Sequence, residues 1–121
     1  MASQQSTVDF LLDQMAGAGD LSAKKMFGEY GIYCDGRMFA IVADDQLFIK
    51  PTDSGRAWIN AQGMLQEASP YPQAKPYFLI DGELWDEREW LTQLAKRTAL
   101  ELPLPKPKPG AQVTKKPVKM F

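Results

Sequence analysis

The chain has 121 residues and a formal net charge of −1, and 45% of its residues are hydrophobic. This length and composition predict one folded domain and exclude an intrinsically disordered chain. Histidine is absent, which excludes Ser-His-Asp and Cys-His nucleophiles and His-ligated zinc sites.

The N-terminal segment is predicted to form a helix over residues 7–16. Its apolar residues recur at helical spacing, and Ser6 followed by Asp9 is typical of a capping box. Gly17 stands where a left-handed residue often ends a helix. We therefore expect the helix to stop at Gly17 and residues 18–23 to form a loop.

A three-stranded antiparallel meander is predicted next, in the runs MFGEYGIYC, RMFAIVA and QLFIK. The runs are separated by Asp35-Gly36 and by Asp44-Asp45. Asp-Gly favours a type I′ hairpin turn because both central residues of that turn need a positive φ. The two glycines within the first run predict a bulge, or close approach of another backbone.

The middle of the chain is predicted to hold a short helix and a long loop. Thr52 or Asp53 can cap the helix, which is expected to run through Ala61. Residues 64–67 are predicted as a brief edge strand. Residues 68–76 contain three prolines, which fix φ and remove amide donors, so this segment is predicted as a loop.

The C-terminal part of the domain is predicted to form two strands and a helix. The strands are expected at 77–80 and 84–85. Asp86 and Glu89 form a capping pattern for the helix, whose apolar stripe continues to Leu102. The sequence therefore predicts an α+β fold over residues 1–102. We expect two layers, an antiparallel sheet of about five strands with helices, in the order α-β-β-β-α-β-β-α.

Residues 103–121 are predicted to be a flexible tail rich in lysine and proline. Prolines at 103, 105, 107 and 109 favour extended polyproline geometry. The charge also changes sign near this boundary. Residues 1–101 hold nine basic and fifteen acidic residues, a net −6, whereas residues 102–121 hold five lysines and no acidic residue.

Residues 24–50 resemble the signature stretch of the TfoX (Sxy) N-terminal domain family of bacterial competence regulators. The similar positions include Met26-Phe27-Gly28, Gly31-Ile32-Tyr33, Asp35-Gly36, Met38-Phe39-Ala40 and Asp44-Asp45. The resemblance extends from about residue 7 to 108 and implies helices on one side of an antiparallel sheet.

The same resemblance bears on function. It implies regulation of gene expression and no catalytic residues. Long members of the family carry a further C-terminal helical domain, so this chain resembles a stand-alone branch. Glu29 departs from the family pattern, because many members have a small residue there.

No catalytic constellation is visible, and the chain is therefore predicted not to be an enzyme. We expect no cofactor and no metal site. Cys34 precedes the anionic Asp35, which would raise its pKa, so it is interpreted as a packed residue. Turn formation and helix capping account for the paired carboxylates.

Two groups of residues are candidates for binding. Tyr71, Lys75 and Tyr77 lie among prolines and could form a rigid contact surface, although packing of the loop over the sheet is the alternative. The tail lysines could contact nucleic-acid phosphates, or form a solvated terminus; they are Lys106, Lys108, Lys115, Lys116 and Lys119. The acidic body argues against a dedicated DNA reader.

The prediction from sequence is a regulatory or protein-interaction module with an unidentified protein partner. The alternative is a nucleic-acid-associated factor that uses the basic tail. The lone cysteine, and the absence of a long apolar run, predict a cytoplasmic protein with no membrane contact. Monomer and homodimer both remain open.

Overall fold

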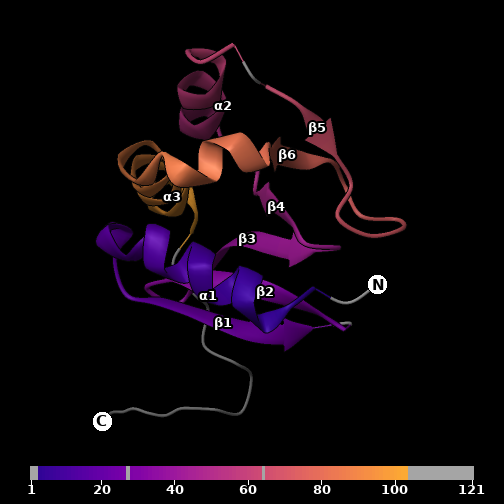
Figure 1. Ribbon diagram of the computed structural model, residues 1–121. Helices are drawn as coiled ribbons and strands as arrows, with labels where there is room; N and C mark the ends of the chain where they lie inside the picture. Colours follow the sequence, from indigo (N-terminus) through magenta and orange to yellow (C-terminus); the bar gives the residue numbers. More distant parts are fainter. Residues whose placement is uncertain (1–2, 27, 64, 104–121) are drawn as a thin grey trace, which may run out of the picture.

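The computed structural model describes residues 3–26, 28–63 and 65–103, which form an α+β fold with an open antiparallel sheet (Figure 1). The six strands lie in the order β1-β2-β3-β4-β6-β5. The strands are Leu21–Met26 (β1), Glu29–Cys34 (β2), Arg37–Ala43 (β3), Gln46–Ile49 (β4), Glu67–Ala68 (β5) and Tyr77–Ile80 (β6). The helices are Gln5–Gln14 (α1), Asp53–Asn60 (α2) and Arg88–Glu101 (α3), with 3-10 helices at Ala16–Ala18 (η1) and Gly82–Asp86 (η2). The predicted fold class is confirmed.

The main core lies between the helices and one face of the sheet. Fully buried side chains come from α1 (Leu11), α2 (Ile59) and α3 (Leu91), and they pack with Leu47 and Ile49 of β4. Helix and strand therefore meet along one continuous apolar layer. None of the helices in the described part of the chain is long and apolar enough to cross a membrane.

Both predicted hairpin turns are present. Asp35 and Gly36 have φ values of 52° and 83°, which places both central residues in the left-handed region required by a type I′ turn. Asp44 and Asp45 also have positive φ, at 53° and 56°. Aspartate tolerates this conformation better than most residues with a Cβ, so two carboxylates stand at one tight turn.

The start of α1 differs from the prediction. The N-cap residue is Gln4, not Ser6, and no side chain caps the helix. The backbone N–H of Gln4 instead donates to Asp45 Oδ1 at 2.9 Å. A carboxylate from the β3–β4 turn therefore sets where the helix begins. Gly17 does not end the helix as a left-handed residue, since it lies within η1.

The segment that was predicted to be a loop followed by one long strand instead forms a β-hairpin of two strands. Residues 18–23 were expected to be a loop, but β1 starts at Leu21 and pairs with β2 from Leu21 opposite Cys34 to Met26 opposite Glu29. Gly28, with φ of 80°, lies in the connection between them and is not a bulge. The irregularity in register occurs at Ile32/Tyr33, between β2 and β3. This extra strand brings the sheet to six.

The second half agrees with the prediction except at η2 and the start of α3. Thr52 caps α2, with Oγ1 accepting from Gly55 N at 3.0 Å. The brief edge strand is present as β5. Residues 84–85 form part of η2 and not a strand, because Asp81 accepts a hydrogen bond from Glu83 N and starts a helical turn. The N-cap of α3 is Glu87, without a side-chain cap, so the predicted Asp86–Glu89 capping pattern is wrong.

Candidate interaction surface

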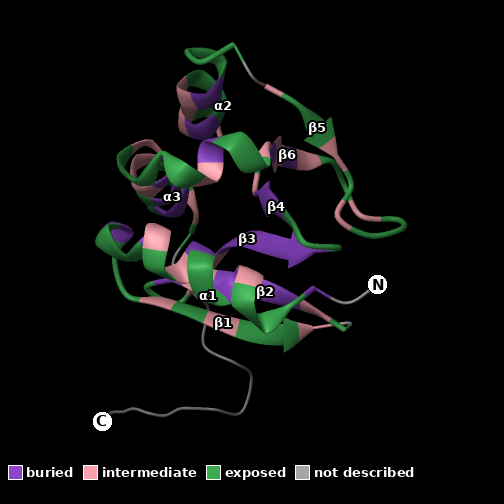
Figure 2. Ribbon diagram, viewed as in Figure 1, coloured by how far each residue is buried: buried purple, intermediate pink, exposed green. Residues whose placement is uncertain are grey.

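A second apolar cluster lies on the sheet face opposite the helices. Strand residues alternate between faces, so Phe48 points away from the core that Leu47 and Ile49 enter. Burial on both faces explains why β3 is buried along most of its length (Figure 2). We call this cluster the open face; it consists of Met26, Met38, Ile41, Ala43, Phe48, Ala68, Tyr77 and Leu79. All eight are strand residues, so none of the described helices contributes to it.

Two methionines lie together over the backbone of β2. A Cβ atom at Gly31 would stand 2.9 Å from Met26 Sδ and 3.0 Å from Met38 Sδ. The missing side chain therefore leaves the space that the two thioethers fill. Both methionines are partly buried. Because Met is unbranched and polarisable, it adapts to different apolar neighbours, which is useful on a binding surface.

The fold brings together only in part the three residues predicted to form a contact surface, Tyr71, Lys75 and Tyr77. Tyr77 lies in β6 and belongs to the open face. Burial, and then the charge of Tyr71, raise the pKa of Tyr77 above its ordinary value. Tyr71 is 41% exposed, and Lys75 is exposed on the same loop. Tyr77 thus belongs to the open face, and Tyr71 and Lys75 lie on the loop that precedes it.

Sequence reasoning missed most of the open face. The signal that could have found it is the run RMFAIVA, whose apolar residues do not alternate with polar ones. Such a run indicates a strand covered on both faces. Its partners from β1 and β6, including Met26 and Leu79, come from distant segments and carry no signal of their own.

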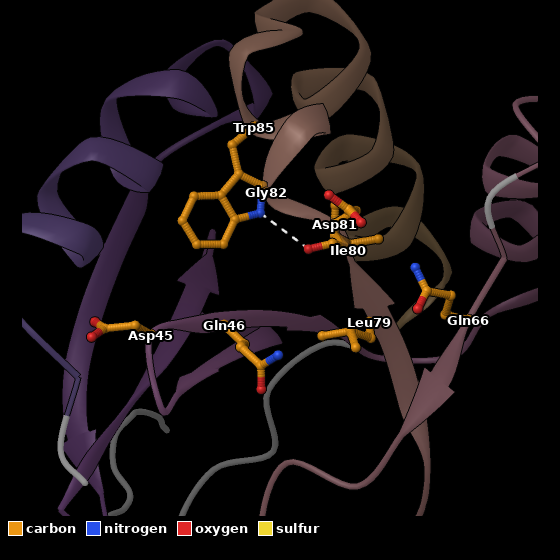
Figure 3. A pocket seen from close by; sticks show the side chains of 8 residues that line it. All are labelled: Asp45, Gln46, Gln66, Leu79, Ile80, Asp81, Gly82 and Trp85. Atoms are coloured by element: carbon orange, nitrogen blue, oxygen red, sulfur yellow. Dashed lines mark hydrogen bonds between the residues drawn. The ribbon is translucent and has the colours of Figure 1, made fainter.

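A hollow of about 500 Å³ opens at the ends of β4 and β6 and shares Leu79 with the open face (Figure 3). Two of its polar side chains already have partners within the fold. Trp85 Nε1 donates to Ile80 O at 3.2 Å, and Asp81 Oδ1 accepts from Glu83 N at 3.0 Å. The lining is completed by Asp45, Gln46, Gln66 and Gly82. These lining residues do not pair a nucleophile with a base.

Glu29 holds the N-terminal segment. Its two carboxylate oxygens accept hydrogen bonds from Ser3 N at 2.8 Å and from Asp44 N at 2.9 Å. Burial alone would raise the pKa of Glu29, but the hydrogen bonds with Ser3 and Asp44 outweigh it and lower the pKa. The charged form is therefore stabilised, and Glu29 has a structural role.

Cys34 is buried, with 1% of its surface exposed. Burial, and next the carboxylate of Asp35, raise the pKa of its thiol above the ordinary value. Its Sγ lies 3.7 Å from the carbonyl oxygen of Ala18, to which the thiol donates. These surroundings favour the neutral thiol. Within residues 3–26, 28–63 and 65–103, no cluster of three or more Cys, Asp or Glu side chains could hold a metal ion.

The five tail lysines predicted to contact nucleic acid lie outside the described residues. Their placement therefore adds nothing to the surface described above. The prediction about them stays a prediction.

Comparison with known proteins shows similarity to a domain family and to a small bacterial protein. A profile of the TfoX N-terminal domain matches residues 13–101. An uncharacterised 12.7 kDa protein encoded in the trpE 5′ region of Spirochaeta aurantia is 34% identical over 118 residues. That match covers 93% of this chain and 99% of the relative. The family match therefore spans the whole sheet and helices α2 and α3.

Proposed function

This chain belongs to the TfoX N-terminal domain family, and from that membership we propose that it is a non-enzymatic regulatory or protein-interaction module. The observation that carries the proposal is the open face, an apolar cluster built from strand residues alone. Contiguous apolar patches at a protein surface mark sites of contact with other molecules. The finer role, proposed from the founding members of the family, is positive regulation of gene expression in the cytoplasm.

The composition of the open face supports this proposal. Tyr77, Met26 and Met38 are partly buried, and tyrosine and methionine are enriched in protein interfaces. The sheet edges are less suited to binding by strand addition. β1 carries Lys24 and Lys25 at one edge, and β5 at the other edge has two residues. Lysines and short strands protect a sheet edge from further pairing.

The experiment compares capture of partners by the wild-type chain and by Met38→Glu, immobilised and exposed to a lysate of the native host. Met38→Glu places a charge on the open face. Leu100→Glu is the matched control, because Leu100 is 68% exposed on α3, away from the open face. We expect a protein retained by the wild type and by Leu100→Glu to be lost with Met38→Glu.

Circular dichroism and thermal unfolding establish that both variants fold. If no protein is retained, or if Met38→Glu retains it as well as Leu100→Glu does, the open face is not the interaction surface. Deletion of the gene supplies the regulatory readout. Unchanged transcript levels after deletion would contradict the regulatory part of the proposal.

A second candidate function is a nucleic-acid-associated factor that uses the basic tail. It is favoured by the net +5 of residues 102–121, since lysines that neutralise phosphates release counterions. Replacing all five tail lysines by glutamine in the full chain tests it. DNA binding should weaken and lose most of its salt dependence; equal binding by both chains would exclude the tail.

A further inference from the structure

We infer that the open face receives an amphipathic protein segment that presents apolar side chains flanked by acidic residues. The inference deepens the proposed function and rests on it, because it names the chemistry of the partner. Three features of the described residues carry it: the depth of the apolar cluster, the sign of the charges around it, and the state of the neighbouring carboxylates.

The deepest residues of the open face are buried, and the residues around them are only partly buried. Ile41 and Phe48 are 1% and 4% exposed, so a partner does not reach them directly. Met26, Met38 and Leu79 are only partly buried and form the contact layer above this floor. Thioether and isobutyl groups make apolar contacts with little directional requirement, so apolar partner side chains fit here.

Two lysines, Lys24 and Lys75, stand against one carboxylate of the same sheet face, that of Glu29, which lies opposite Met26 in the pairing of β1 with β2. Lys24 lies in β1 two residues before Met26, on the same face of the strand, and its Nζ is 5.1 Å from the centroid of the Tyr33 ring. Lys75 is exposed in the loop that leads into β6. Both oxygens of Glu29 already accept hydrogen bonds from backbone N–H groups of the chain, which leaves the positive charges of the two lysines in excess. Electrostatic complementarity therefore favours a partner with negative charges beside its apolar residues.

The nearest carboxylates at the end of the sheet are occupied. Glu29 accepts from Ser3 N and Asp44 N, and Asp45 Oδ1 accepts from Gln4 N and from Thr7 Oγ1. These contacts hold both carboxylates against the N-terminal segment. Both oxygens of Glu29 and Oδ1 of Asp45 are thus already engaged by groups of the chain itself.

Two other occupants fit less well. A second copy of the chain, related by a two-fold axis, would bring the same lysines of both copies to one interface, where the Glu29 carboxylate is already engaged by Ser3 N and Asp44 N. A single-stranded nucleic acid needs exposed ring faces for stacking. Here Lys24 lies over the Tyr33 ring, and Tyr77 packs within the cluster.

The test uses three synthetic helical peptides and the full chain labelled with ¹⁵N. One peptide carries leucine and phenylalanine on one side and glutamate on the other. The second has lysine in place of every glutamate, and the third is a scrambled acidic peptide. Amide shifts are followed during titration, at two salt concentrations. A DNA oligonucleotide and light scattering test the other two occupants.

We expect saturable shifts at Met26, Met38, Tyr77 and Leu79 with the acidic amphipathic peptide. The dissociation constant should rise about tenfold in the Lys24→Glu/Lys75→Glu double variant, because two attractive contacts become repulsive. Lys96→Glu, an exposed charge reversal on α3, is the matched control and should bind as the wild type does. Added salt should weaken binding.

Equal or tighter binding of the lysine peptide, or shifts confined to the helices, would overturn the inference. Stronger shifts of the open face with DNA, or a dimer that buries it, would do the same. These failures are distinct from failure of the proposed function. If Met38→Glu still abolishes capture of a host protein, the interaction surface stands and only the chemistry of the partner is wrong.

Discussion

The carboxylate of Glu29 accepts a hydrogen bond from the backbone N–H of Ser3, with 2.8 Å between Oε1 and the nitrogen. The two residues are 26 positions apart in the sequence. A second hydrogen bond holds the same residue, because Asp45 N donates to Ser3 Oγ at 2.9 Å. The N-terminal segment is thus attached to β2 and to the β3–β4 turn before α1 begins.

Replacing Glu29 by alanine should lower the free energy of unfolding at pH 7 by about 1–3 kcal/mol, because Ser3 N and Asp44 N lose their acceptor. Glutamine, which keeps one acceptor oxygen, should cost less. The pKa of Glu29 is lowered in the folded chain, so its contribution is present above the ordinary pKa of 4.5 and is lost as the pH falls through the lower folded value.

Urea denaturation between pH 7 and pH 3 measures both effects. Glu29→Gln should flatten the loss of stability below the ordinary pKa of 4.5, relative to the wild type. Glu83→Gln, which removes an exposed carboxylate of η2, serves as the control for the loss of one negative charge. Identical acid profiles for Glu29→Gln and the wild type would contradict the assigned role.

Local sequence signals predicted the elements that depend on neighbouring residues. Asp35-Gly36 specified its turn because positive φ is a property of the two residues themselves. The start of α2 was also predicted from neighbouring residues, because the hydrogen bond that caps the helix joins Thr52 to Gly55 N, three residues away. The order of the later elements followed from apolar spacing.

The remaining features depend on contacts between distant residues. β1 reads LSAKKM, which is polar because an edge strand needs only part of one face to be apolar. The start of α1 depends on Asp45, 41 residues after Gln4. In the same way, the open face combines Met26 with Tyr77, and no window of sequence contains both.

The phenol of Tyr77 should ionise above its ordinary pKa. Burial, and then Tyr71, raise its pKa above the ordinary value of 10.0. In a spectrophotometric titration of the phenols, Tyr77→Phe should remove a step that lies above pH 10.0. If the wild type and Tyr77→Phe show the same steps above that pH, the raised pKa of Tyr77 is contradicted.

The same titration reports on the open face. Because a partner that covers Tyr77 increases its desolvation, the acidic amphipathic peptide should move the Tyr77 step further upward. The scrambled peptide is the control. An unchanged step at saturating peptide would show that the peptide does not cover Tyr77.

Thr98 and Thr92 should respond in opposite directions to replacement by valine. Thr98 is 0% exposed on α3, and its Oγ1 has no hydrogen-bond partner among the described residues. Thr92, on the same helix, donates from Oγ1 to Gln14 O at 2.8 Å. Thr98→Val should raise the free energy of unfolding by about 1 kcal/mol, and Thr92→Val should lower it by about 1 kcal/mol. Chemical denaturation measures the free energy of unfolding of both variants. Equal destabilisation of the two would mean that Thr98 Oγ1 does have a hydrogen-bond partner.

Cys34 should react slowly with thiol reagents in the folded chain. It is 1% exposed, and burial followed by Asp35 raises the pKa of its thiol. We expect labelling by iodoacetamide at pH 8 to be at least about a hundredfold slower than in the urea-unfolded chain. Mass spectrometry over time measures both rates. Comparable rates would show that the thiol is accessible and would exclude a purely packed role.

Gly31→Ala tests how firmly the two methionines of the open face are held. The new Cβ would lie 2.9 Å from Met26 Sδ and 3.0 Å from Met38 Sδ, so both thioethers must move. Because these atoms end flexible side chains, the cost in stability should be small, about 1 kcal/mol or less. The ε-methyl signals of Met26 and Met38 should shift clearly in ¹³C spectra, and binding of the acidic amphipathic peptide should weaken.

Gly82→Ala provides the control for this last experiment, because a Cβ there meets no atom within 4 Å. Its stability, its methionine signals and its peptide binding should all match the wild type. A loss of stability at Gly31→Ala well beyond that expected for movable thioethers would mean that the methionines are rigidly packed. In that case the open face would lack the adaptable layer on which binding of an apolar segment depends.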